Sequence, residues 1–470
     1  MNSQILFKLS FVDYSIFVVL FLITFLFVLY GNRKKHKDRD SLLDYLVLGR
    51  QLTLPFFITN LVASWYGGIF GVTKIAFESG IYNFLTQGLF WYVAYLIFAF
   101  FLVDKISMYN AMTLPDLTKK LFGKKSSQIA SVLTFFNILP VSYVISLGLF
   151  FEMAFGLSFL HGMILGILAI YIYSLFGGGM RGIVFADFIY AIVMCTAVAI
   201  LFFYSWYIWG GYTYLIDKVP ATHFTLTGGE SISSVLVWGF IALATLVDPC
   251  FYQTCLCAKS PQIAKKGIFI SIVIWFCFDI CTTFGSIYAR AYMPTANPKH
   301  AYLLYGMTIL PEGLKGLFLA GILATIVSTA DSFLLITANT LSYDIMGLRG
   351  KKMIWMNHFS FIFIAVVSIL LSLYFEGDIK MAWKTLGSYM AASLLIPMLF
   401  GFKFPKLISD NTFFIASLLS IVGITWWRYQ DHHGFTQHID AFYIGLLISF
   451  LVIMVSLRSV LLGFIKKYLP

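Results

Sequence analysis

Apolar and polar residues are arranged in long blocks along this chain. Apolar runs of roughly 20 residues recur from end to end, the length that crosses a hydrocarbon layer as an α-helix. A membrane β-barrel would instead alternate apolar and polar residues, whereas these runs are apolar on every side. The pattern predicts an all-α polytopic membrane protein. Its thirteen transmembrane helices are expected at residues 11–31, 53–76, 84–104, 128–155, 158–176, 183–208, 233–255, 267–292, 314–346, 353–375, 380–402, 411–428 and 441–462.

Composition agrees with this pattern, because 60% of the residues are hydrophobic and only 11% are charged. A soluble protein could not hide so much apolar surface in its core, so lipid must be the solvent for most of it. The longest hydrophilic stretches, residues 104–127, 210–231 and 293–314, are too short to form a core of their own. We therefore expect residues 1–470 to form a single transmembrane domain.

The net charge of +11 does not indicate a nucleic-acid partner, because the basic residues are concentrated in particular loops. If the first helix starts outside, the basic loops all fall inside, as the positive-inside rule requires. This places the N-terminus outside and, after thirteen crossings, the C-terminus inside. The basic loops are residues 33–39, 119–125, 259–266, 349–352 and 466–467.

Two of the apolar segments are interrupted. Residues 63–71 (ASWYGGIFG) contain three glycines, and Asp248-Pro249 lies within the seventh segment. Counted from the second helix, these segments begin two inverted five-helix halves, residues 53–208 and 233–402, with 11–31 before them and 411–462 after. Broken helices at matching positions of inverted halves indicate a transporter's binding site. Close glycine packing and a proline kink would explain each break singly, but the matched pair favours a binding site.

The ninth segment carries a stripe of hydroxyl groups. Thr325, Ser328, Thr329 and Ser332 are spaced so that they share roughly one helix face. Hydroxyl oxygens suit a small hard cation such as sodium, although they also join helices by hydrogen bonds. Asp331 favours an ion site, because a carboxylate at membrane depth costs about 2.5–3.5 kcal/mol on insertion scales and is therefore a functional candidate.

Four further acids in the apolar segments are candidates, of which Glu152 lies near the outer end of its helix and could be solvated. Asp187 follows a glycine-rich turn and could pair with Arg181 or reach a cation site. Asp248 could accept hydrogen bonds from backbone amides exposed at the helix break, and Asp279 has no evident partner. No nucleophile, metal cluster or acid pair converges, so the sequence predicts no enzyme and no cofactor, and without a phosphate-binding loop we do not expect ATP to drive the protein.

At this point the chain resembles the sodium:solute symporter family, which includes sodium/glucose, sodium/proline and sialic acid transporters. Six motifs occur in the family's order between residues 44 and 344. They are residues 44–50 (DYLVLGR), 63–68 (ASWYGG), 113–116 (TLPD), 178–187 (GGMRGIVFAD), 248–253 (DPCFYQ) and 328–332 (STADS).

The resemblance implies a leucine-transporter-like fold with a 5+5 inverted repeat, and alternating access driven by a sodium gradient. Carried over motif by motif, one sodium site comprises the carbonyls of Ala63, Tyr66 and Thr325 and the side chains of Ser328 and Thr329. A second sodium or proton site would use Asp187, Asp331 and Ser332. The family's usual arginine after the helix 6 glutamine is Thr254 here, and the sugar-coordinating pattern of the glucose transporters is not evident.

The predicted function is sodium-coupled symport of a small solute such as an amino acid, organic acid, vitamin or nucleoside. The solute contacts are expected at Trp65, Gln87, Phe151, Tyr252 and Gln253. Proton coupling on the same fold and a transporter-derived solute sensor are the alternatives. Sodium, the solute and the lipid bilayer are the expected partners, and a bacterial inner membrane is the expected location.

Overall fold

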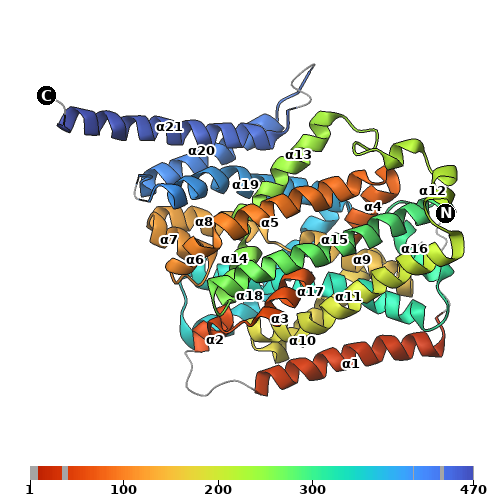
Figure 1. The fold of residues 1–470 in the computed structure, drawn as a ribbon. Helices are drawn as coiled ribbons and strands as arrows, with labels where there is room; N and C mark the ends of the chain where they lie inside the picture. The colour runs from red at the N-terminus through yellow and green to blue at the C-terminus, as the bar shows by residue number, and fades with distance from the viewer. Residues whose placement is uncertain (1–8, 34–40, 406, 434–438, 469–470) are drawn as a thin grey trace.

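The computed structural model describes residues 9–33, 41–405, 407–433 and 439–468, and in these ranges the chain is a bundle of helices that run roughly parallel (Figure 1). Each of the thirteen expected segments is largely helical, and those at residues 53–76 and 233–255 each contain a break. The basic loop at residues 33–39 lies largely outside the described residues. The main helices are α1 (Phe11–Arg33), α3 (Leu54–Ala63), α4 (Ile69–Ser79), α5 (Phe90–Phe101), α8 (Lys124–Asn137), α9 (Val141–Phe155), α10 (Phe159–Gly177), α11 (Met180–Trp209), α13 (Ile232–Ala242), α14 (Pro249–Cys257), α15 (Pro261–Tyr292), α17 (Leu314–Asn339), α18 (Gly350–Tyr374), α19 (Ile379–Lys403), α20 (Asp410–Arg428) and α21 (Ala441–Tyr468).

Shorter helices and turns connect these elements. They are α2 (Ser41–Val47), α6 (Val103–Met108), α7 (Leu114–Leu121), α12 (Tyr212–Lys218), α16 (Ala301–Ile309), the 3₁₀ turns η1 (Leu48–Arg50), η3 (Ala221–Phe224) and η4 (Leu243–Val247), and the π-helical turns η2 (Phe84–Leu89) and η5 (Thr340–Ile345).

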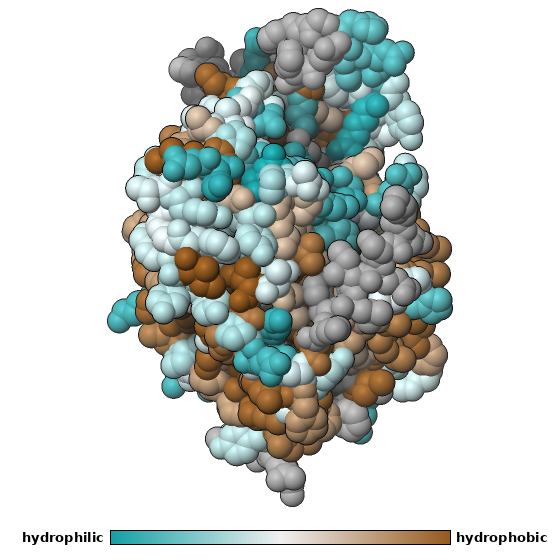
Figure 2. Space-filling view, turned by 90° about the vertical axis from the view of Figure 1, so that its right-hand side faces the viewer, coloured by the Kyte–Doolittle hydropathy of each residue, from teal (hydrophilic) through white to brown (hydrophobic). Residues whose placement is uncertain are grey.

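Within the described ranges, nine helices are long and apolar enough to cross a membrane, or ten if the bent pair around Asp248 forms one span. Large apolar side chains such as Phe101, Leu370 and Val455 are more than half exposed, as expected where helices face lipid. Figure 2 looks onto the end of the bundle where α12 and α16 lie; its upper half is mostly hydrophilic or weakly polar, and hydrophobic residues gather in the lower half and at the sides. The protein is therefore a multi-pass membrane protein.

Among the described helices long enough to cross a membrane, α17 with η5 is the most enclosed, and every predicted hydroxyl ligand in it is buried. It packs against α11, α1, α18 and α9, and α11 in turn packs against α3. A buried helix of this kind can present polar groups to its neighbours without exposing them to lipid. The α17 hydroxyl stripe therefore lies inside the protein.

Both predicted helix breaks are present. Helix α3 ends at Ala63 and α4 begins at Ile69. A Cβ atom on Gly68 would lie 2.0 Å from Cζ2 of Trp383 in α19, so the break needs glycine for close approach. The second break lies between η4 and α14, where Asp248 caps α14 by accepting a hydrogen bond from the Phe251 amide at 2.8 Å, and Pro249 occupies the first helical position.

Candidate functional site

The end of α3 meets the α17 hydroxyl stripe directly. The Ser328 hydroxyl lies 2.9 Å from the Ala63 carbonyl oxygen, and the Thr329 hydroxyl lies 3.2 Å from the same oxygen. The Thr325 carbonyl lies 3.2 Å from both hydroxyls. Because Ala63 is the last residue of α3, no amide four residues later in the same helix donates to its carbonyl, which is therefore available to an ion or a hydroxyl. Four of the five residues expected around the first sodium are thus gathered at one place, all of them buried.

The fifth residue, Tyr66, was expected to contribute its backbone carbonyl. The adjacent Gly67 approaches α17, because its amide donates a hydrogen bond of 2.8 Å to the Thr329 hydroxyl. The Tyr66 side chain turns towards α15, where its hydroxyl donates to Asp279 at 2.6 Å. A carbonyl contact from Tyr66 to sodium therefore stays a prediction.

A second buried polar group lies between α3, α11 and α17. The Asn60 amide donates to one oxygen of Asp187 at 2.7 Å, and the other oxygen of Asp187 has no partner among the described residues. Asp331 is close enough to act electrostatically on Asp187, and both are almost fully buried. Ser332 touches Ser64 at 3.5 Å. Two neighbouring buried acids can both be ionised only if a cation is near, so this cluster suits a sodium ion or a proton.

Arg181 does not pair with Asp187, although the sequence left that pairing open. It pairs instead with Asp44 of α2, with 2.6 Å between its Nη2 atom and the carboxylate. Both side chains of this pair are nearly buried. The ion pair therefore joins α2 to the start of α11 and leaves the Asp187 cluster without this cation.

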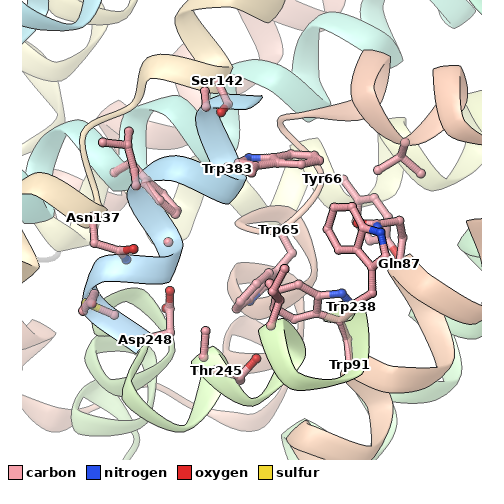
Figure 3. Close-up of a pocket in the computed structure, with 18 of the residues that line it drawn as sticks. Trp65, Tyr66, Gln87, Trp91, Asn137, Ser142, Trp238, Thr245, Asp248 and Trp383 are labelled. Atoms are coloured by element: carbon pink, nitrogen blue, oxygen red, sulfur yellow. The ribbon is translucent and has the colours of Figure 1, made fainter. Parts of the chain in front are cut away.

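A cavity of about 170 Å³ lies between the two helix breaks (Figure 3). Its wall is formed by the 63–69 break, α4, η2, α5, the junction of α8 and α9, the α13–η4 segment with Asp248, α15, α17 and α19. Of the residues expected to contact solute, Trp65 and Gln87 line it. Trp238, Thr245 and Trp383 also line it, and no distinctive motif marked them in the sequence.

The three other expected contacts lie elsewhere. The Tyr252 hydroxyl donates to the Leu246 carbonyl at 2.8 Å, and the Gln253 amide donates to the Leu46 carbonyl at 2.5 Å. Helix α14 begins at the edge of the cavity, so its N-cap Asp248 reaches the cavity while Tyr252 and Gln253 face protein. Phe151 lines a separate apolar cavity of about 220 Å³ beside α1. Their assignment as solute contacts finds no support in these positions.

Asp279, for which the sequence offered no partner, accepts hydrogen bonds from two tyrosines. Tyr66 comes from the α3–α4 break and Tyr92 from α5, and both tyrosines line the cavity. Asp279 itself is 1% exposed. The carboxylate thus lies directly behind the cavity wall and fixes the positions of two of its rings.

A model of the sodium:solute symporter family matches residues 45–413. The chain belongs to this family. It is 26% identical over 408 residues to an osmoregulated proline transporter of Bacillus subtilis, with 77% of this chain and 79% of the relative covered. It is 24% identical over 487 aligned residues to a sodium/proline symporter of Staphylococcus aureus, with 93% and 92% covered. Family membership identifies the protein as a transporter.

Solved structures with the same fold include a sodium-coupled sialic acid symporter in a substrate-bound, outward-open state. The TM-score is 0.78 at 16% identity, with 96% of this chain and 97% of that chain covered. A nucleobase-cation-symport-1 transporter, Mhp1, matches with a TM-score of 0.55 at 12% identity, with 92% and 96% covered. These likenesses show that the fold is the leucine-transporter-like fold that the resemblance implied.

Proposed function

We propose that this protein is a sodium-coupled symporter that carries a small organic solute across a bacterial inner membrane by alternating access. The observation that carries the proposal is the meeting of the Ala63 carbonyl with the Ser328 and Thr329 hydroxyls, 2.9 and 3.2 Å away. Helix-end carbonyls and hydroxyls are hard oxygen ligands, and irregular backbone at membrane depth is tolerated where it lines such a site.

In this proposal sodium is cargo and is held by oxygens of Ala63, Tyr66, Thr325, Ser328 and Thr329. The relatives that are named as sodium/proline and sodium-coupled sialic acid symporters support coupling to sodium. A second ion would bind at Asp187, Asp331 and Ser332, supported by the Asp187 oxygen that lacks a partner among the described residues. This cluster is also where a proton would bind if the protein were proton-coupled.

The solute would bind in the cavity between the breaks, in contact with Trp65 and Gln87. We propose one transport domain of thirteen crossings, with the N-terminus outside and the C-terminus inside. Residues 53–208 and 233–402 would form its inverted halves, with 11–31 leading and 411–462 trailing. Cavities at the interface of such halves are where secondary transporters bind their substrates.

The test compares the thermal unfolding midpoint of purified protein in sodium chloride and potassium chloride at equal ionic strength. A ligand that binds only the folded protein raises this midpoint by mass action, and the measurement needs no knowledge of the solute. We expect a sodium-specific rise. Uptake of radiolabelled candidate solutes into proteoliposomes under an imposed sodium gradient follows. Uptake that needs a proton gradient and ignores sodium would contradict the proposal, and solute binding without net flux would indicate a sensor.

A further inference from the structure

The cavity between the breaks is lined largely by aromatic rings. Indoles come from Trp65, Trp91, Trp238 and Trp383, and phenols from Tyr66 and Tyr92, among others. Figure 3 shows indole rings from separate elements arranged around the same space. The face of an aromatic ring carries negative electrostatic potential and attracts cations. Rings on several sides of one cavity form the kind of enclosure that holds alkylated ammonium groups.

The cavity also has a carboxyl side chain on one side. Asp248 is a lining residue, and the described lining residues include no lysine, arginine or histidine. One oxygen of Asp248 accepts the Phe251 amide at 2.8 Å. Figure 3 shows the carboxylate pointing into the space between Asn137 and Trp65. The partial positive charge of the α14 N-terminus is thus already paired with Asp248, so this helix end offers an anion no free binding site.

The phenol oxygens of two tyrosines and the hydroxyl of Thr245 also present polar groups to the cavity. The Tyr66 and Tyr92 hydroxyls donate their protons to Asp279 behind the wall, so towards the cavity these phenols offer oxygen lone pairs and ring faces. The Thr245 hydroxyl, which is fully buried and lines the cavity beside Asp248, has no hydrogen-bond partner among the described residues. A buried polar group without a partner is costly, so its position at the cavity indicates a ligand that bonds with it.

We propose that the solute carries a cationic nitrogen, an alkylated ammonium group, which binds against the Asp248 carboxylate within this aromatic enclosure. This inference rests on the proposed function, because it takes the cavity as the transport site. A solute whose only charge is negative would face the Asp248 carboxyl, whose charge is offset only in part by the α14 N-terminus, and would find no positive side chain in the described lining. The cationic group therefore determines specificity, and any second polar group of the solute bonds to Gln87, Asn137 or Thr245.

The test uses pairs of probes that differ in the cationic nitrogen. Choline is compared with 3,3-dimethyl-1-butanol, in which carbon replaces the quaternary nitrogen, and L-proline with cyclopentanecarboxylate. Tetramethylammonium is the minimal probe. Thermal unfolding midpoints of the full chain are measured in saturating sodium across a titration of each probe. We expect stabilisation by at least one cationic probe and at least a tenfold weaker effect of its carbon analogue. Stabilisation by neither choline, proline nor tetramethylammonium, or equal stabilisation by both members of a pair, would overturn the proposal.

Asp248→Asn supplies the second arm, because asparagine caps a helix as well as aspartate does and leaves only the charge changed. The matched control is Asp378→Asn, since Asp378 caps α19 through the Met381 amide at 2.9 Å and lies outside the cavity. We expect Asp248→Asn to weaken binding of the cationic probe at least tenfold and Asp378→Asn to leave it unchanged.

The outcomes separate this inference from the proposed function. If the sodium-specific stabilisation without solute persists in Asp248→Asn while cationic binding is lost, both stand. If Asp248→Asn abolishes the sodium response itself, Asp248 binds an inorganic cation and the inference fails. If wild-type protein shows no sodium response but binds the cationic probes in potassium, the proposed function fails and the inference survives. Because the probe pairs are compared in the wild type, a misfolded variant does not remove the test.

Discussion

Replacing Ser328 by alanine should weaken sodium binding while leaving the helix in place. The substitution removes one of the five proposed oxygen ligands, a hydroxyl that lies 2.9 Å from the Ala63 carbonyl. We expect sodium affinity to fall about tenfold, which corresponds to about 1.4 kcal/mol. At a sodium concentration of 100 times the wild-type dissociation constant, sodium stabilises the folded protein by about 2.7 kcal/mol, and in the variant by about 1.4 kcal/mol.

The assay is the difference between the unfolding midpoints in sodium and in potassium, measured for each variant separately. This difference cancels the cost of the lost hydrogen bond, about 0.5–1.5 kcal/mol, which affects both salts alike. Ser372→Ala is the matched control, because the Ser372 hydroxyl is also fully buried and contacts a carbonyl of another helix, Val141, at 3.2 Å. A reduced sodium response in both variants, or in neither, would refute the assigned site.

Three further predictions use other parts of the structure. Asp44→Asn leaves Arg181 buried without its partner and should lower the free energy of unfolding by about 3–5 kcal/mol. The double variant Asp44→Leu with Arg181→Met should lower the thermal unfolding midpoint much less, because no buried charge then lacks a partner. Gly68→Ala would place a Cβ atom 2.0 Å from the Trp383 ring, so it should cost about 1–3 kcal/mol, and Trp383→Leu in the same chain should recover most of the unfolding midpoint. Burial lowers the pKa of His223, a residue of the η3 turn whose ring donates to the Phe77 carbonyl of α4 at 3.0 Å. The neutral, buried imidazole therefore contributes fully to the free energy of unfolding above about pH 6.5. This contribution should be lost as the pH falls towards the lowered folded-state pKa, because the unfolded chain takes up the proton first. In His223→Gln the unfolding midpoint should vary less with pH over that range, and a variant with the same pH dependence as the wild type would contradict the reasoning.

The helices of this fold could be predicted from the sequence because a membrane helix needs an apolar run of about 20 residues, which is visible in the sequence itself. The breaks could be found as well, since glycines and Asp-Pro are rare within apolar runs. Helical spacing placed the Ser328 and Thr329 hydroxyls on one face of the ninth segment, whereas the Ala63 carbonyl was expected beside them only because the family resemblance implied it. Local patterns suffice where the chemistry lies on one or two helices.

Residues that converge from many helices could not be found in this way. Trp383 reaches the cavity from α19, far along the chain from the first break, and its sequence surroundings resemble any apolar helix. The pairing of Asp279 with Tyr66 and Tyr92 joins three helices, and nothing in their spacing reveals it. Tyr252 and Gln253, which were expected to contact solute, do not line this cavity, because a motif fixes the residue type but not the direction in which a short helix points the side chain.

The α3–α4 break connects the two proposed sites through very few residues. The Ala63 carbonyl and the Gly67 amide contact Thr329 on the sodium side, while Trp65 and Tyr66, which lie between them in the chain, line the cavity. An ion held at Ala63 and Thr329 would fix the backbone at both ends of this segment, and so would hold the two rings in place before solute arrives. Linkage then requires a solute that contacts these rings to tighten sodium binding by the same factor. Coupling in this protein would need no long pathway, because four consecutive peptide bonds belong to both sites.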